Sequence, residues 1–280
     1  MNTYRHNRLN LLKRIMKYSI IGMLVLIILL PYAWLLLDSF KERIDRFAIP
    51  PKIFFPPTLN NYLYAFVDGG FFQNMINSLI IALCSTAISL VFGVPAAYAM
   101  SVKKSRLGTI ILFITIMTRI VPELAIVVPL YNYFNILGLF GKHLGIILAH
   151  VLYNIAFVVL LMKNFFEQIP KEINDSGLID GCTPLNSFLR LSLPLAAPGL
   201  AATAIFCIVM SWDEFVYSFI LSSESTKTLP VAIPTLITLF GAKWGQATAV
   251  SVATMIPVII LAFIIQRALI KGLTSGAVKG

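Results

Sequence analysis

The stretch Pro170–Gly199 reads PKEINDSGLIDGCTPLNSFLRLSLPLAAPG and separates two long apolar segments of the chain. Membrane proteins usually join their helices by short connections. A long polar loop that is rich in helix start and stop signals therefore indicates a docking element. The alternative is a loop that only packs on the membrane helices of its own chain.

The first half of this loop carries the signals of a short helix. Pro170 suits the first helical position, where its missing N–H costs nothing. Glu172 and Asp175 place negative charge near the helix start, which the helix dipole favours. We expect this helix to run to about Ile179 and to stop at Gly181.

The second half of the loop predicts a second helix. Thr183 is its expected cap, with Pro184 at the first helical position. On the first helix, Ile173, Gly177 and Gly181 recur every four residues and share a face. The two glycines there leave the backbone bare for close approach by another surface. The loop is thus predicted to be helix, turn, helix, with one bare face.

The composition places the chain in a bilayer. Of its 280 residues, 58% are hydrophobic and 12% are charged, about half the charged share of a soluble domain. The net charge of +10 is spread in clusters between apolar runs, which suits membrane lipid headgroups and excludes a nucleic-acid partner. The three cysteines, Cys84, Cys182 and Cys207, are far apart, so neither a disulfide nor a metal site is expected.

Six apolar segments are long enough to cross a membrane. The third contains Pro122 and Pro129 and is expected to be kinked or broken. The region 229–240 is apolar but short, and it is interpreted as a re-entrant or interfacial piece. The six predicted spans are Tyr18–Leu37, Met75–Met100, Leu107–Phe134, Leu144–Met162, Leu195–Leu221 and Ala247–Ile270.

These spans predict one all-α transmembrane domain over residues 1–280. An uncleaved N-terminal helix, 18–37, precedes a core of about five helices over roughly 70–275. With the N-terminus in the cytoplasm, the inner segments carry 14 Lys and Arg residues against 7 in the outer ones. The positive-inside rule therefore places both termini and the loop 163–194, between the fourth and fifth spans, in the cytoplasm.

The spacing within the loop is similar to a known motif. Asp175-Ser176-Gly177, three residues, Gly181, nine residues and Leu191-Ser192-Leu193-Pro194 resemble the EAA motif of ABC importer permeases. That motif reads Glu-Ala-Ala, three residues, Gly, nine residues, Ile-x-Leu-Pro. The segments FLRLSLPLAAPGL, AAYAM, WDEF and the C-terminal GLTSGAVKG also resemble sugar permeases of the maltose transporter type. The likeness covers nearly the whole chain and is strongest to the shorter, MalG-like subunit.

This resemblance implies a partner for the loop and for the C-terminus. In the family, the loop is a coupling helix that sits in a cleft of a separate ATPase subunit, and the tail reaches the ATPase dimer. The implied ATPase contacts in the loop are Glu172, Asp175, Ser176, Gly177, Asp180, Gly181, Leu191 and Pro194. Those in the tail are Gly276, Ala277, Val278, Lys279 and Gly280.

The resemblance also implies the other subunits of the transport complex. The partners would be a second, MalF-like permease, two ATPase subunits and an extracytoplasmic sugar-binding protein, in a bacterial inner membrane. The chain has no GxxxxGK[ST] phosphate loop and no catalytic constellation. We therefore expect no enzyme activity and no cofactor on this chain, with ATP and Mg²⁺ bound by the partner ATPase.

Three departures from the family pattern stand out. Asp175 keeps the carboxylate of the Glu-Ala-Ala triplet, but Ser176 and Gly177 replace two helix-favouring alanines. Cys182 stands where a small residue is usual, and Asp213 stands where family members often have Asn. The first loop helix is therefore expected to be less stable than in relatives, while the spacing of the motif is kept.

Two charged clusters lie within predicted spans, where ionisable groups are costly and mark functional candidates. Arg119 and Glu123 have i, i+4 spacing, which allows an ion pair on one helix face. They are interpreted either as a polar gate in the translocation path or as a structural pair. Trp212, Asp213 and Glu214 suit a sugar path, because rings stack on sugars and carboxylates accept from hydroxyls. An interfacial tryptophan or partner contacts are the alternatives.

The residues are also compatible with other functions. A self-contained, proton-coupled secondary transporter would use the charged groups within the spans and would not need the long loop. An ABC importer permease for a non-sugar osmolyte is another alternative. The sequence does not identify the sugar, whether this subunit touches it, or whether the permease pair is a heterodimer or a homodimer.

Overall fold

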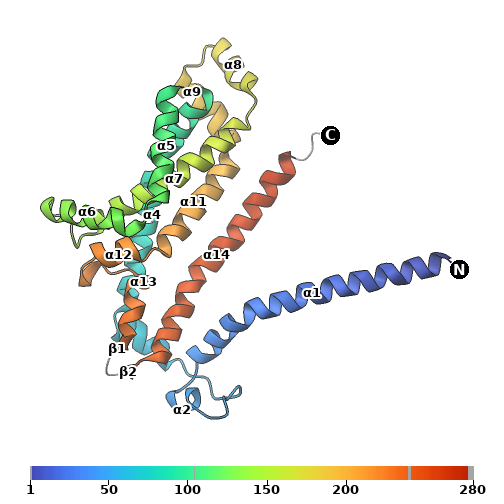
Figure 1. The fold of residues 1–280 in the computed structure, drawn as a ribbon, viewed down its shortest axis with the longest axis vertical. Helices are drawn as coiled ribbons and strands as arrows, with labels where there is room; N and C mark the ends of the chain where they lie inside the picture. The colour runs from blue at the N-terminus through green and yellow to red at the C-terminus, as the bar shows by residue number, and fades with distance from the viewer. Residues whose placement is uncertain (1, 104, 239–240, 277–280) are drawn as a thin grey trace. The chain divides into compact units, whose positions relative to one another are not determined.

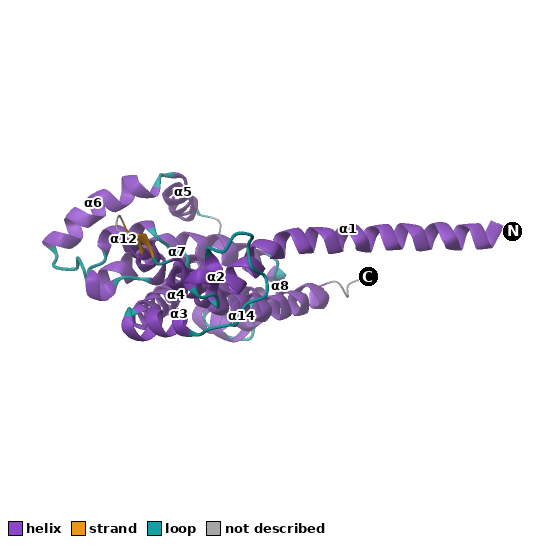
Figure 2. Ribbon diagram, turned by 90° about the horizontal axis from the view of Figure 1, so that it is seen from below, coloured by secondary structure: helices purple, strands orange, loops and turns teal. Residues whose placement is uncertain are grey.

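The computed structural model of the chain describes residues 2–103, 105–238 and 241–276 (Figure 1). Most of this part is helical, as Figure 2 shows by colour. It divides into two compact units, Met1–Gly69 with Leu236–Ala253, and Gly70–Thr235 with Thr254–Gly280. The last helix, α14 (Trp244–Gly276), contributes to both units and contains the predicted sixth span.

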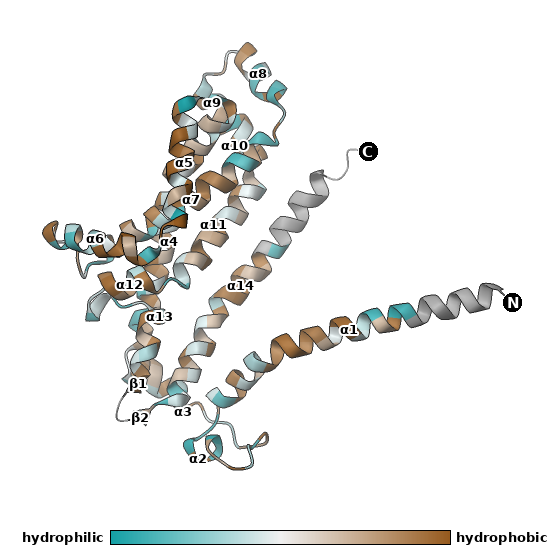
Figure 3. Ribbon diagram, in the orientation of Figure 1, coloured by the Kyte–Doolittle hydropathy of each residue, from teal (hydrophilic) through white to brown (hydrophobic). Residues whose placement is uncertain are grey.

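The smaller unit begins with the long helix α1 (Asn2–Ser39), which contains the first predicted span. None of the most apolar stretch of α1 is buried against the rest of the chain. The hydropathy colouring of Figure 3 shows this run of apolar residues. The end of α1 differs from this stretch, because Asp38 and Ser39 are buried.

Polar contacts hold the segment after α1 together. Arg46 Nε donates to Asp38 Oδ2 at 2.9 Å, and the Asn61 side chain donates to the carbonyls of Ser39 and Lys41 at 2.8 and 2.9 Å. The remaining elements of this unit are α2 (Arg43–Arg46), α3 (Asn60–Leu63), the π-helical turn η1 (Tyr64–Asp68) and the strands β1 (Ile237–Thr238) and β2 (Gly241–Ala242). The two strands pair antiparallel, with Ile237 opposite Ala242.

The larger unit is built around two helices that pack along their lengths, α4 (Phe71–Val102) and α7 (His143–Glu167), with α11 (Ala197–Trp212) packed on both. A Cβ on Gly93 of α4 would lie 2.7 Å from Val158 Cγ1 of α7. Glycine therefore permits this close approach of the two helices. These helices carry the second, fourth and most of the fifth predicted spans.

Two buried clusters stabilise this unit at different levels. One joins α4, α7, α6 (Glu123–Ile136) and α12 (Val216–Leu221) and includes Ile81, Val127 and Tyr217. The other joins the ends of α4 and α7 to the polar loop and includes Ala97, Phe166 and Phe188. The loop is thus part of a core rather than a loose connection.

Among the described residues, four helices are long and apolar enough to cross a membrane, or up to six spans are present if each bent pair counts as one. One bent pair is α5 (Arg106–Ile120) with α6, at 101°. The predicted third span is therefore broken at Val121–Pro122. The predicted fifth span, Leu195–Leu221, is also divided, since α11 ends at Trp212 and α12 begins at Val216.

The segment after α12 is made of short pieces. They are the 3-10 turn η3 (Glu224–Thr226), α13 (Leu229–Ala232) and the 3-10 turn η4 (Ile233–Leu236). Leu229 N donates to Ser78 Oγ of α4 at 2.9 Å, and Asn77 Nδ2 donates to the carbonyls of Ser225 and Lys227. As predicted, the described part of 229–240 contains no spanning helix.

Candidate coupling loop and membrane-embedded polar cluster

The polar loop folds as helix, turn, helix. Its first helix is α8 (Lys171–Ile179), and Pro170 precedes the helix as its cap residue rather than occupying the first helical position. Gly181 has φ +85°, a left-handed conformation that ends the helix and that glycine adopts without steric cost. Thr183 Oγ1 then accepts from Asn186 N at 3.3 Å and caps α9 (Pro184–Ser187), with Pro184 at its first position.

The second half of the loop is helical as far as Leu195 and then bends at Ala196. A π-helical turn, η2 (Phe188–Ser192), and the short α10 (Leu193–Leu195) lead from α9 to α11. The bend between Pro184–Leu195 and Ala197–Trp212 is 77°. Gly199, at the start of α11, lies so close to the ring of Phe165 on α7 that a Cβ at this position would clash with the ring.

The outward side of α8 is acidic. Glu172, Asp175 and Asp180 are all exposed, and so is Ser176. Ile179 is 85% exposed at the end of the helix, next to this charge. The arrangement suits contact with a protein surface that carries basic groups around an apolar patch.

The predicted bare face of α8 is only partly confirmed. Gly181 has open space around its α-carbon, but Gly177 is buried. A Cβ on Gly177 would lie 2.5 Å from Leu191 Cδ1, so the surface that approaches Gly177 belongs to the second half of the same loop. Gly177 thus permits the predicted close approach of another surface, and that surface belongs to the same chain. Of the other predicted contacts, Pro194 is exposed and Leu191 is half-buried.

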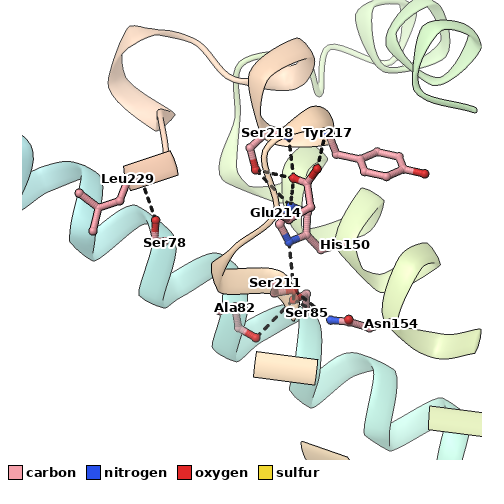
Figure 4. A network of polar contacts seen from close by, with 10 residues as sticks. All are labelled: Ser78, Ala82, Ser85, His150, Asn154, Ser211, Glu214, Tyr217, Ser218 and Leu229. Atoms are coloured by element: carbon pink, nitrogen blue, oxygen red, sulfur yellow. Dashed lines mark hydrogen bonds and ion pairs between the residues drawn. The ribbon is translucent and has the colours of Figure 1, made fainter. Parts of the chain in front are cut away.

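A second polar site lies inside the helix bundle and centres on His150, which is fully buried on α7 (Figure 4). His150 Nδ1 lies 3.0 Å from Ser211 Oγ, and Nε2 lies 3.1 Å from Glu214 Oε2 and 3.2 Å from Ser218 Oγ. The network continues from Ser211 Oγ to Ser85 Oγ of α4 at 3.0 Å. It therefore connects α4, α7, α11 and α12.

Glu214 is held by more than the histidine. Its carboxylate accepts from Tyr217 N at 2.7 Å, from Ser218 N at 3.0 Å and from Ser218 Oγ at 2.9 Å. A carboxylate that accepts backbone N–H groups at a helix start caps that helix. Glu214 thus fixes the entry of α12 and, through His150, ties it to α7.

The three residues of the Trp-Asp-Glu cluster do not share a surface. Trp212 is 2% exposed and its Nε1 donates to Thr254 O at 3.2 Å, while Glu214 is 7% exposed. Neither the tryptophan ring nor that carboxylate is open to a sugar in this conformation. Asp213 is exposed and keeps its place as a predicted contact in the translocation path.

The predicted i, i+4 pair of Arg119 and Glu123 is not formed. Val121 is extended, as the residue before a proline favours, and Pro122 separates α5 from α6. The two charges therefore sit on different helices rather than on one face. The Arg119 guanidinium instead lies 3.9 Å from the centre of the Tyr153 ring and 5.8 Å from that of Phe157, a cation–π arrangement.

The buried histidine is the functional candidate that the sequence reasoning missed. His150 and Asn154 are four residues apart on α7, and Ser211, Glu214 and Ser218 follow helical spacing on the next span. Two polar stripes on neighbouring apolar spans were the available signal. In the described part of the chain, no group of His, Cys, Asp or Glu is arranged to hold a metal ion.

The predicted C-terminal contact is largely outside the described residues. Gly276 ends α14, while Ala277, Val278, Lys279 and Gly280 lie beyond the part that the structure describes. Their contact with an ATPase stays a prediction.

The apolar helices of the described part, with two bent pairs among them, together with the helix-turn-helix loop define a multi-span membrane protein. Residues 89–275 match the family described as the inner membrane component of binding-protein-dependent transport systems. The chain belongs to this family, which confirms the resemblance found in the loop and in the segments around it.

Two relatives and one solved structure extend the match over the chain. A sulfoquinovosyl glycerol transport system permease from Agrobacterium fabrum is 33% identical, with 90% of this chain and 89% of the relative covered. A diacetylchitobiose uptake system permease from Streptomyces coelicolor is 31% identical, with 89% and 91% covered. A bacterial ABC transporter involved in import of the polysaccharide alginate has the same fold, with a TM-score of 0.76 at 23% identity over 90% of this chain and 95% of that one.

Proposed function

We propose that this chain is a permease subunit of an ATP-driven, binding-protein-dependent importer of a sugar or oligosaccharide in a bacterial plasma membrane. Family membership supports the transporter class. The relatives named for sulfoquinovosyl glycerol and diacetylchitobiose support a carbohydrate substrate. The chain lacks a phosphate-binding loop, so ATP and Mg²⁺ are bound by a separate ATPase subunit.

The observation that carries this proposal is the exposed acidic helix α8, which ends at the left-handed Gly181 and is braced by its own second half. A short, braced helix with charge on its outer side is suited to transmit a conformational change of another protein. We propose that Glu172, Asp175, Ser176 and Asp180 contact the ATPase directly. Gly177, Gly181, Leu191 and Pro194 set the shape of the loop that carries them.

The complete machine contains a second, MalF-like permease, two ATPase subunits and an extracytoplasmic binding protein. In this arrangement the loop 163–194 and both termini face the cytoplasm. The exposed apolar surface of α1 supports further subunits or lipid around this chain. Of the predicted translocation path, Asp213 is exposed and Arg119 and Glu123 are half-exposed, so these three groups remain its candidates.

The proton-coupled secondary transporter is less well supported. Glu214 makes several hydrogen bonds as a helix cap, and Arg119 lies over aromatic rings rather than beside Glu123. Neither arrangement offers an obvious site for proton exchange with water. A non-sugar osmolyte importer would share the loop and differ only in cargo.

The test is reconstitution of the chain in proteoliposomes, alone and with the second permease, the ATPase and the binding protein. Sulfoquinovosyl glycerol and diacetylchitobiose serve as radiolabelled probes, with glycine betaine as the osmolyte control. We expect uptake of a sugar probe only when all subunits and ATP are present. Uptake by the chain alone under a proton gradient, without ATP, would overturn the proposal. Uptake of glycine betaine alone would contradict the sugar assignment.

A further inference from the structure

One side-chain oxygen connects the polar loop to the membrane helices. Oδ1 of Asn174, on α8, accepts from Ser192 Oγ at 2.7 Å, from Tyr98 OH at 3.2 Å and from Ser187 Oγ at 3.3 Å. Ser187 ends α9 and Ser192 ends η2, while Tyr98 is in the last turns of α4. Three separate elements thus meet on a single acceptor.

The tyrosine that reaches this acceptor is itself fixed by ring packing. The Tyr98 ring centre lies 5.4 Å from that of Phe166, edge to face, and 4.9 Å from that of Phe188. Phe166 is near the end of α7 and Phe188 begins η2, and both are buried. The hydroxyl of Tyr98 therefore holds a position set jointly by α4, α7 and the loop.

Burial makes the acceptor hard to replace. Ser187 is 1% exposed and Ser192 is 0% exposed, so water is excluded from both residues. Loss of Oδ1 removes an acceptor from two buried hydroxyls, and a buried polar group without a partner is costly. On the same helix, Glu172 and Asp175 are exposed to solvent. The outer side of α8 is therefore free to contact a partner, while Asn174 lies on its inner side.

We infer that Asn174 is a positioning residue that makes α8 move as one body with the ends of α4 and α7. The inference rests on the proposed function, because it assumes that an ATPase moves α8 from outside. A displacement of α8 then reaches α4 through Tyr98 and reaches the start of α11 through Ser187 and Ser192. The neighbouring contact of Gly177 with Leu191 keeps the two halves of the loop from sliding past each other.

Four variants of the full chain, assembled with its ATPase and second permease, test this role. Asn174→Leu removes the acceptor, whereas Asn174→Asp keeps Oδ1. Tyr98→Phe removes only the hydroxyl and keeps the ring packing. Asn186→Leu is the matched control on α9, where the contact with Thr183 uses the backbone N–H of Asn186. Each variant also replaces Cys84, Cys182 and Cys207, so that spin labels attach only at cysteines introduced at the exposed positions 102, at the end of α4, and 171, at the start of α8.

Two readouts separate transmission from folding. One is the distance distribution between the labels on α4 and α8, measured with ATP and vanadate; the other is ATP hydrolysis by the assembled complex. For Asn174→Leu we expect a broadened distribution and ATP hydrolysis changed by about fivefold, with about twofold for Tyr98→Phe. We expect Asn174→Asp and Asn186→Leu to keep the narrow distribution.

The outcomes distinguish the two proposals. If the wild-type chain does not bind an ATPase, the proposed function fails. If it does, and Asn174→Leu and Tyr98→Phe both keep the narrow distribution and the hydrolysis of the wild type, the role of Asn174 is overturned. A broadened distribution in Asn186→Leu to the same extent would also overturn it, because the effect would then not be specific to this oxygen.

Discussion

Gly177 lies directly against Leu191, so that a Cβ at position 177 would be 2.5 Å from Leu191 Cδ1. The two residues belong to the two ends of the spacing that identified the loop. The spacing is therefore a packing requirement between α8 and η2, and not only a recognition pattern for another protein. Ser187 Oγ would also lie 3.6 Å from the same Cβ, in van der Waals contact with it.

A side chain at position 177 should force the two loop helices apart. For Gly177→Val we expect about tenfold weaker association with the ATPase, since overpacking of this kind costs about 1–3 kcal/mol. Leu191→Ala makes room and should restore part of the loss. Copurification of the ATPase with each single variant and with the double variant measures the coupling between the two positions. Simple additivity of the two effects would contradict the contact.

The turn at Gly181 depends on backbone conformation rather than on space. Its φ of +85° disfavours a β-branched residue, while a Cβ at this position would meet no described atom within 4 Å. We expect Gly181→Val to cost about 1–2 kcal/mol and to reduce transport-linked ATP hydrolysis, with expression kept. Gly181→Asn, which tolerates the left-handed region, should stay close to the wild type. Equal loss in both variants would show that bulk, not backbone, matters.

The acidic side of α8 should govern binding of the ATPase in a salt-dependent way. Charge reversal of exposed Glu172 or Asp180 to Lys should weaken association by about tenfold at low ionic strength, because like charges would face each other. Glu224→Lys, an exposed reversal in η3, is the control and should leave association unchanged. Titration of ATPase binding at several salt concentrations provides the measurement. A salt-independent loss would contradict an electrostatic contact.

The His150 network should contribute to stability rather than to cargo selection. His150→Leu removes the histidine partner of the buried Glu214 and Ser211, and we expect a loss of about 3 kcal/mol. Asp213→Asn, at an exposed position, should change stability by less than about 0.5 kcal/mol. Thermal unfolding of the detergent-solubilised protein measures both. A normal melting temperature in His150→Leu would contradict this role.

Much of the fold follows from local signals in the sequence. The cap at Thr183, the stop at Gly181 and the end of α8 near Ile179 are encoded within a few residues, so these predictions are confirmed. The break in the third span followed from Pro122 in the same way. Of the two interpretations of Arg119 and Glu123, the structural ion pair is wrong, because i, i+4 pairing requires a helix that continues through that break; the polar gate stays a prediction.

The parts that could not be predicted depend on contacts between distant segments. His150 becomes a candidate only when α7 is brought against α11 and α12, more than sixty residues away in the chain. Leu191 and Asn174 lie within one loop, but their contacts require the turn at Gly181 to fold one helix back on the other. Single-residue patterns say nothing of such pairings, which are set by packing.

The break between α5 and α6 also constrains what can lie beside it. Val121 N donates to Met117 O and Ala125 N donates to Pro122 O, but the break still interrupts the regular backbone hydrogen bonding of a spanning helix, and hydrocarbon offers no replacement partners. Ile120 is 66% exposed and Val121 is 41% exposed in this chain, so its own helices do not enclose the gap. Acyl chains alone are the wrong solvent at this position. Another subunit or water must therefore lie beside the break and supply hydrogen-bond partners. The break thus indicates that this chain by itself is not a complete membrane structure.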